Sequence, residues 1–175
     1  VDGILADLGV SSHQFDVPER GFSTRFEAPL DMRMNQNQTK TASDILNTYS
    51  ELDITEVLKN YGEINNYKCF VKGIIKYRNN NKISTTSDLI DAVSGCFPQH
   101  KKNKFLAQLF QALRIEVNNE IDVLKSLLTQ ATESLKSGGR LVVISYHSLE
   151  DRLVKNFIKS GHFDGKIEKD FYGNP

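Results

Sequence analysis

The chain has 175 residues, of which 39% are hydrophobic, and its 22 Lys and Arg residues balance 22 Asp and Glu residues. This length suits one domain, or a modest core that carries an insertion. No apolar run approaches the roughly 18 residues that a membrane span needs, which argues against a membrane protein. A neutral total charge creates no long-range field that attracts nucleic acid, so any contact with RNA must come from a local patch.

Cys69 and Cys96 are far apart in the sequence, and no CxxC pair is present. This spacing argues against a zinc site and against a disulfide framework, and it suits a reducing cytosol. We therefore expect both cysteines to be small core residues. Both chain ends are expected to be cuts, because Val1 falls directly in an apolar run and residues 173–175 form a turn sequence.

A short apolar run at residues 3–8, followed by Gly9, is typical of a buried parallel strand. From Gly9 to about Lys40 neither a helical nor a strand period holds. A loop of about 30 residues is unusual in a compact domain unless it is functional or disordered. This one is too rich in Phe, Leu and Met for simple disorder, so we expect a functional loop.

Residues 41–98 predict several short helices. Apolar residues recur at helical spacing within 42–49, 54–61, 67–78 and 89–97. Gly62 is expected to end the second of these segments, and Pro98 to close the last. Thr86 or Ser87 is the expected cap of the last helix. These segments together predict a small all-helical unit.

The last third of the chain has a different pattern. Residues 105–117 and 121–135 each present one apolar helical face, and the glycines at 138 and 139 break the second helix. Residues 141–144 are fully apolar and predict another buried strand. Residues 148–151 resemble a capping box that opens a helix reaching Ile158. Helix, turn, strand and helix in this order are typical of a doubly wound α/β sheet, of which two core strands are visible.

In such sheets, ligands bind outside the carboxyl ends of the strands, which directs attention to Asp7 and His147. A carboxylate at the end of a buried strand is costly unless it has a partner. Asp7 is therefore either held by loop amides or caps a helix, or it contacts a cofactor or a substrate amine. His147 has the same two interpretations, and Ser148 is first of all a helix cap.

Several segments, in order along the chain, resemble the bacterial ribosomal small-subunit RNA methyltransferase H family, also called MraW. They are residues 2–12 (DGILADLGVSS), 20–23 (RGFS), 29–34 (PLDMRM), 110–115 (FQALRI), 139–141 (GRL) and 147–152 (HSLEDR).

The resemblance implies an S-adenosylmethionine-dependent enzyme that methylates the exocyclic N4 of a cytidine in small-subunit (16S) ribosomal RNA, near the decoding centre. The implied fold is α/β: part of a class I (Rossmann-like) S-adenosylmethionine-dependent methyltransferase sheet with an inserted small all-helical domain. We expect the core at residues 1–34 and 104–175 and the insertion, which helps recognise RNA, at 35–103. The expected partner is small-subunit RNA or the 30S subunit in the cytoplasm, with neither membrane nor metal.

Carried over by position, Asp7 and Gln14 look like cofactor-contacting residues, and Asp7 and His147 are the catalytic candidates. A cytosine amine is a poor nucleophile, so the site must align it closely with the methyl donor. Aromatic side chains can hold the base, and arginines can meet phosphates. The candidates for contacts with the RNA substrate are Ser11, Ser12, Phe22, Arg33, Arg114 and Tyr146.

The sequence departs from the family in several places. It contains neither the glycine-rich loop that cradles the cofactor nor the acidic residue that holds the ribose, and we expect both upstream of Val1. Residues 64–67 also differ from the usual continuation. We therefore expect this chain alone to be inactive. The alternatives are a class I methyltransferase with another substrate, and a non-catalytic RNA-binding module.

Overall fold

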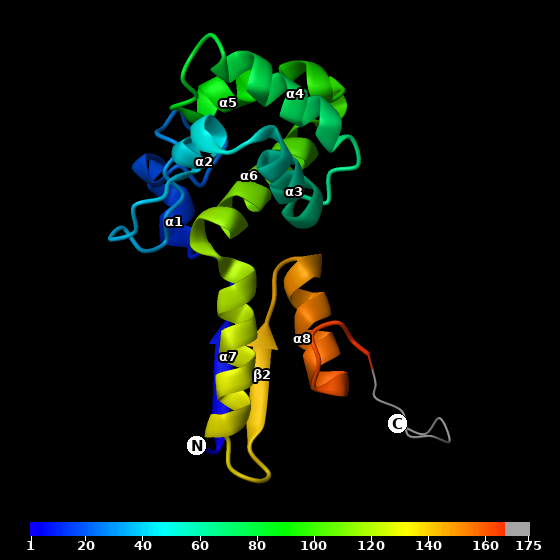
Figure 1. The fold of residues 1–175 in the computed structure, drawn as a ribbon. Coiled ribbons are helices and arrows are strands. Elements are labelled where there is room, and N and C mark those ends of the chain that lie inside the picture. Colours follow the sequence, from blue (N-terminus) through cyan, green and yellow to red (C-terminus); the bar gives the residue numbers. More distant parts are fainter. Residues whose placement is uncertain (167–175) are drawn as a thin grey trace. The chain divides into compact units, whose positions relative to one another are not determined.

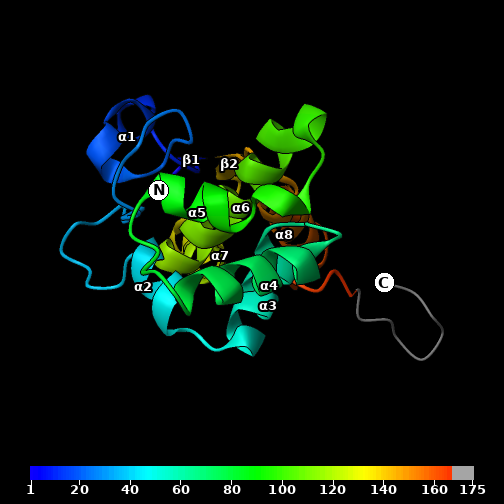
Figure 2. The ribbon, with the colours of Figure 1, turned by 90° about the horizontal axis from the view of Figure 1, so that it is seen from above.

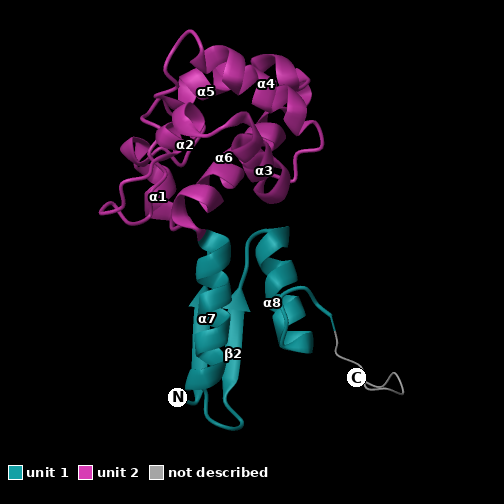
Figure 3. Cartoon of the chain, viewed as in Figure 1, with its two compact units in different colours: residues 1–9, 120–175 teal, residues 10–119 magenta. Residues whose placement is uncertain are grey.

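A computed structural model describes residues 1–166, which divide between two compact units (Figure 3). Unit 1 combines Val1–Gly9 with Glu120–Pro175, and unit 2 is Val10–Asn119. The domain boundaries predicted after residues 34 and 103 concern the layout of the family and stay predictions. The turn predicted at 173–175 lies outside the described residues.

Unit 1 is built on two parallel strands, β1 (Gly3–Asp7) and β2 (Arg140–Ile144), as the sequence predicted. Their register pairs Gly3 with Arg140 and Asp7 with Ile144. The unit also contains helices α7 (Glu120–Ser134) and α8 (Ser148–Ser160), which contact each other (Figure 1). The amino group of Val1 donates to the Ser134 carbonyl at 2.8 Å, so the end of α7 is held at the start of β1.

The two strands are covered on one face within the described residues, which corrects the expectation that they are buried on both. Exposure alternates along each strand, as the two-residue period of a strand requires. Leu5 is 70% exposed, and its register partner Val142 is 52% exposed. Asp7 and Ile144 share this open face. The fully apolar composition could not distinguish one covered face from two.

Unit 2 is mainly helical, as predicted for its central part. It contains α2 (Ala42–Thr48), α3 (Glu51–Tyr61), α4 (Tyr67–Arg78), α5 (Thr86–Ala92) and α6 (Lys102–Asn118). The long helix α6 packs against α2 and α3, and α4 packs against α3 and α5 (Figure 2). Their apolar faces meet in one core, which includes the fully buried Leu58, Phe70, Ile74, Leu89 and Leu109. None of the described helices of either unit is long and apolar enough to cross a membrane.

Local capping explains where several helices begin. Thr85 caps α5 together with Asp88, so neither Thr86 nor Ser87 is the cap. Thr86 is buried instead, and its hydroxyl donates to the Phe26 carbonyl at 2.7 Å. The helix ends at Ala92, and a short 3-10 turn η2 (Ser94–Cys96) fills the space before Pro98.

The start of α8 also differs from the prediction, because Ser148 is the first residue inside the helix. The capping position belongs to His147, whose side chain makes no cap hydrogen bond. The amide of Tyr146 donates to the Glu150 carboxylate at 3.1 Å and thereby closes this end of the helix.

The segment from Gly9 to Lys40 is better ordered than its lack of periodicity suggested. It includes a short helix α1 (Ser12–Asp16) and a 3-10 turn η1 (Pro18–Arg20). Phe22, Leu30 and Met32 are buried in the core of unit 2. The loop is also joined to the segment before α5 by an antiparallel bridge between Pro29 and Thr85. Apolar anchors and backbone hydrogen bonds therefore replace regular structure here.

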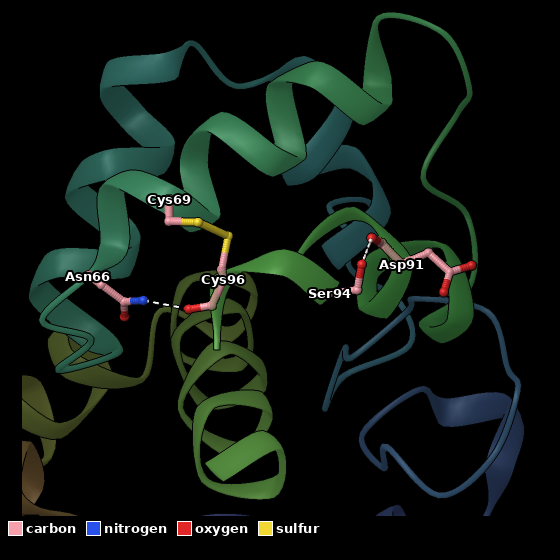
Figure 4. The surroundings of a disulfide bond; sticks show 5 residues. All are labelled: Asn66, Cys69, Asp91, Ser94 and Cys96. Atoms are coloured by element: carbon pink, nitrogen blue, oxygen red, sulfur yellow. Dashed lines mark hydrogen bonds between the residues drawn. A yellow bond between two sulfur atoms is a disulfide. The ribbon is translucent and has the colours of Figure 1, made fainter. Parts of the chain in front are cut away.

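Cys69 and Cys96 form a disulfide, which contradicts the expectation of two reduced core cysteines (Figure 4). Their Cα atoms are 5.5 Å apart although 27 positions separate them in the chain. The packing of α4 against η2 brings them together, and the Asn66 side-chain amide donates to the Cys96 carbonyl beside the bridge. Cys69 is exposed rather than buried.

Candidate functional site

The carboxyl ends of β1 and β2 bring Asp7 next to Tyr146. Asp7 is the last residue of β1, and the amide of Leu8 still donates to the Ile144 carbonyl at 3.0 Å, so the two strands end together. The Tyr146 hydroxyl donates to Asp7 Oδ1 at 2.9 Å. The hydrogen bond to Asp7 and the negative charge of its carboxylate raise the pKa of Tyr146.

Asp7 keeps most of its capacity to accept hydrogen bonds. An ionised carboxylate offers about four acceptor positions, and Tyr146 occupies one of them. Both side chains are exposed at the strand ends. The Asp7 carboxylate can therefore accept from an amine or a hydroxyl group of a ligand, or face a positive charge. The other interpretation required backbone amides of the loop to donate to the Asp7 carboxylate, but among the described residues its hydrogen bond comes from Tyr146.

Gly9 shapes the turn after β1. Its φ of +85° is a conformation that side chains with a Cβ rarely adopt, and a Cβ atom there would lie 3.4 Å from the Tyr146 ring. Glycine at this position lets the chain leave the strand while the tyrosine ring stays beside it.

Behind Tyr146, the side chain of His147 lies against Glu150. The imidazole Nε2 is 3.2 Å from Glu150 Oε1, and the two side chains are 9% and 3% exposed. Glu120, the first residue of α7, brings its carboxylate to the same place. Among residues 1–166, these three side chains form a group whose chemistry could hold a metal ion.

Unit 2 contains a separate cavity of about 310 Å³ between the loop after α1 and one face of α6. This volume is at the small end of the range for ligand pockets. Phe15 and Phe22 meet edge to face there, with ring centroids 6.5 Å apart. The cavity therefore combines aromatic faces with amide, hydroxyl and guanidinium groups. Its lining residues include Phe15, Phe22, Arg25, Phe110, Gln111 and Arg114.

The comparisons with known proteins agree with one another. A family model described as the MraW methylase family matches residues 1–171. This chain belongs to the MraW methylase family. It is 58% identical over 174 residues to "Ribosomal RNA small subunit methyltransferase H" of Cytophaga hutchinsonii, which covers 99% of this chain and 58% of that protein.

Other proteins of the same name are similarly close to this chain. The one from Flavobacterium johnsoniae is 57% identical over 99% of this chain and 58% of its own length. The one from Amoebophilus asiaticus is 56% identical over 100% of this chain and 56% of its own length. The chain thus spans somewhat more than half the length of these curated relatives.

Among the residues expected to form the site of this MraW family member, Asp7, Tyr146 and His147 lie in unit 1 at the strand ends. Phe22 and Arg114 line the cavity of unit 2. Ser11 and Gln14 form a capping box at the start of α1, where Gln14 Oε1 accepts from the Ser11 amide at 2.8 Å. This bond leaves the amide NH₂ of Gln14 as the group available to a ligand. Ser12 is exposed as the first residue of α1.

Arg33 makes bonds within its own loop. Its guanidinium pairs with Asp31 at 2.7 Å and donates to the Gln36 and Gln38 carbonyls. Partial burial would raise the pKa of Asp31, but the hydrogen bonds and charge of Arg33 lower it overall. This geometry assigns Arg33 the role of holding residues 31–38, and its contact with RNA stays a prediction that the geometry does not favour.

Sequence reasoning missed Glu120 and Glu150 as neighbours of His147, and it missed Phe15 and Gln111 as cavity residues. Helical spacing could have found Gln111, because it lies three positions before Arg114 on the same face of α6. No comparable signal connects Glu120 to His147, which lies 27 positions later in another element.

Proposed function

We propose that this chain is part of an S-adenosylmethionine-dependent methyltransferase that acts on the exocyclic N4 of a cytidine in small-subunit (16S) ribosomal RNA. Membership of the MraW methylase family over residues 1–171 carries this proposal. The names of the relatives support an RNA substrate from the small ribosomal subunit.

The proposal extends to architecture and location. Two parallel strands with α7 and α8 support a class I, Rossmann-like sheet, in which helices of residues 35–103 are an inserted domain. The partner would be the RNA of the small subunit or the 30S subunit, in the cytoplasm.

The donor set at the strand ends fits S-adenosylmethionine, which supplies an electrophilic methyl group when bound. Asp7 offers a carboxylate with unused acceptor positions, and Tyr146 offers an exposed ring at the edge where ligands of parallel sheets bind. Asp7 would hold the cofactor, and Gln14 could donate to it through its NH₂ group. The positioning of these groups, rather than a general base, would supply much of the rate, because the product amine can lose its proton after transfer.

The acceptor base must leave its stack to be reached, and aromatic side chains with hydrogen-bonding neighbours usually hold such a base. The cavity with Phe22 and Gln111 has this character.

The second part of the proposed insertion is richer in basic residues than the first. Residues 62–103 contain seven Lys and Arg against three Asp and Glu, whereas residues 35–61 contain two against four. Lys68, Lys72 and Lys76 recur every four residues on the exposed side of α4, and among the described residues none has an ion-pair partner. Such a row supports phosphate contacts that position the RNA without reading its sequence.

The test replaces Asp7 in the full-length protein and measures N4-methylcytidine in small-subunit RNA by mass spectrometry, in cells that otherwise lack the protein. Asp7→Asn is expected to lower methylation by about 100-fold, because a misplaced donor or acceptor loses that much rate. The matched control is Asp2→Asn, immediately before the start of the same strand, where an exposed carboxylate pairs with Lys136 at 3.3 Å. Circular dichroism should show both variants folded.

Full methylation by Asp7→Asn would overturn the role of Asp7. Loss of a different methylated nucleoside in cells lacking the protein would favour a class I methyltransferase with another substrate. If no modification is lost but the protein still binds small-subunit RNA, the non-catalytic module is the correct interpretation.

A further inference from the structure

The side chains of Glu120, His147 and Glu150 lie close together in unit 1, although the first belongs to the start of α7 and the other two to the start of α8. Glu120 begins α7, His147 caps α8, and Glu150 lies in the first turn of α8. One ligand atom from each residue lies within 4.8 Å of the other two. Glu150 is buried, and the other two residues are half-buried.

The imidazole of His147 is the unexplained member of this group. Its side chain is 9% exposed, and within the described residues neither ring nitrogen has a hydrogen-bond partner. The 3.2 Å approach of Nε2 to Glu150 Oε1 is close, but it lacks the alignment of a hydrogen bond. A buried imidazole without partners is costly, because it has given up its bonds to water. A positive ion between this nitrogen and the carboxylates would give the imidazole the partner that it lacks.

Glu150 is oriented for this role by the backbone. Its Oε2 accepts from the Tyr146 amide at 3.1 Å, which turns Oε1 toward His147. Carboxylates that bind metals are commonly fixed by such a bond on the second oxygen. The same hydrogen bond connects the carboxylate to the residue that donates to Asp7.

We propose that Glu120, His147 and Glu150 bind a first-row divalent metal ion of the Zn²⁺ or Mn²⁺ type. One imidazole and two carboxylates suit these ions, whereas Mg²⁺ and Ca²⁺ prefer oxygen ligands alone. Bonds of about 2.0–2.2 Å place two ligand atoms of one ion at most about 4.4 Å apart, so a small side-chain movement closes the site. Two carboxylates also balance the charge of a divalent cation.

The ion would join the start of α7 to the start of α8 and fix the segment that carries Tyr146. It is therefore a positioning site, and no step of methyl transfer passes through it. This inference departs from the expectation that the protein uses no metal. That expectation came from the sequence, in which no metal-binding side chains recur at the close spacing of a known motif. Here Glu120 and His147 are 27 positions apart, so sequence spacing could not reveal them as a pair of ligands.

The experiment uses the full-length protein freed of metal with a chelator. Zn²⁺ alone is titrated in a calorimeter, the bound metal is counted by mass spectrometry, and Mg²⁺ serves as the comparison ion. We expect one Zn²⁺ per chain, binding at least about 100-fold more tightly than Mg²⁺. Glu120→Gln should weaken Zn²⁺ binding by at least about 10-fold. The matched control is Glu133→Gln, an exposed carboxylate on the same helix, which should leave binding unchanged.

Glu120 is the residue replaced in this test because it is half-buried. A change at the buried Glu150 could instead unfold the start of α8. A readout on the unaltered protein supports it: X-ray absorption of the Zn²⁺ complex should show one imidazole nitrogen and carboxylate oxygens. Equal Zn²⁺ affinity in Glu120→Gln and the parent would overturn the proposal, as would a stoichiometry near zero. None of these readouts depends on methylation, so they are separable from the proposed function.

Discussion

The hydrogen bonds of the Asn118 side chain allow the loss of stability in an Asn118 variant to be predicted bond by bond. It is 8% exposed near the end of α6, and its side chain holds the loop that carries Met32 and Met34. Its Nδ2 donates to the Met32 carbonyl at 2.8 Å and to the Arg114 carbonyl at 2.9 Å, and its Oδ1 accepts from the Met34 amide at 2.7 Å. Met32 is fully buried with a φ of 60°, so it needs these bonds to keep an unfavourable conformation.

Asn118→Ala removes three hydrogen bonds and leaves the Met34 amide and the Met32 carbonyl without this partner. At about 1 kcal/mol for each bond, the free energy of unfolding should fall by about 3 kcal/mol. With a urea dependence of about 2 kcal/mol per molar, the midpoint of urea unfolding should move down by about 1.5 M. Circular dichroism of the full-length protein in urea measures this shift.

Two further variants sharpen the test. Asn118→Asp keeps the acceptor for Met34 but loses both donors, so it should also destabilise. Asn103→Ala, on the exposed face of the same helix, should change the free energy of unfolding by less than about 0.5 kcal/mol. If Asn118→Ala shifts the midpoint no more than Asn103→Ala does, the loop is not held by this side chain and the reasoning fails.

Two other predictions concern unit 2. Reduction of the Cys69–Cys96 disulfide, which closes a loop with a sequence separation of 27, should lower the free energy of unfolding by about 3 kcal/mol because the unfolded chain regains freedom. A reductant should lower the unfolding midpoint of the parent but not that of a Cys69→Ser, Cys96→Ser double variant; equal sensitivity of the two would contradict it. Burial would raise the pKa of Asp88, but hydrogen bonds from the Ser84 and Thr85 amides and the Thr85 and Tyr77 hydroxyls lower it overall. Because the folded pKa is the lower one, the carboxylate stabilises the fold fully above its ordinary value of 3.8, and this contribution is lost as the pH falls through the folded pKa. Asp88→Ala should therefore cost about 1 kcal/mol near neutral pH and much less near pH 2, as urea unfolding at both pH values can show. A penalty that does not change with pH would refute the role of the charge.

Local patterns were enough to predict most elements of the chain. Helical spacing predicted α2, α3, α4, α6 and α7 to within a few residues, because each buries one face and ends at a local signal. Apolar runs beside glycines predicted β1 and β2 as core strands of a parallel sheet, and the structure showed that the two pair directly with each other. Asp7 and His147 could be chosen because strand ends in such sheets carry the chemistry. The motifs also sufficed to predict the family.

Tertiary structure decided the contacts between residues that no local pattern connects. Cys69 meets Cys96, and Glu120 meets His147, because packed helices bring distant positions together. The same packing gives Asn118 its role, which depends on the Met32 carbonyl and the Met34 amide, both more than 80 positions away. Sequence spacing reports on neighbours within a few turns or strand residues, since only those are related by a fixed backbone geometry. By itself the sequence thus determined the elements, the family and the carboxylate at the end of β1. The hydrogen bond from the Tyr146 hydroxyl to this carboxylate, and the burial of His147 against Glu150, became visible only when β1 and β2 ended at the same edge.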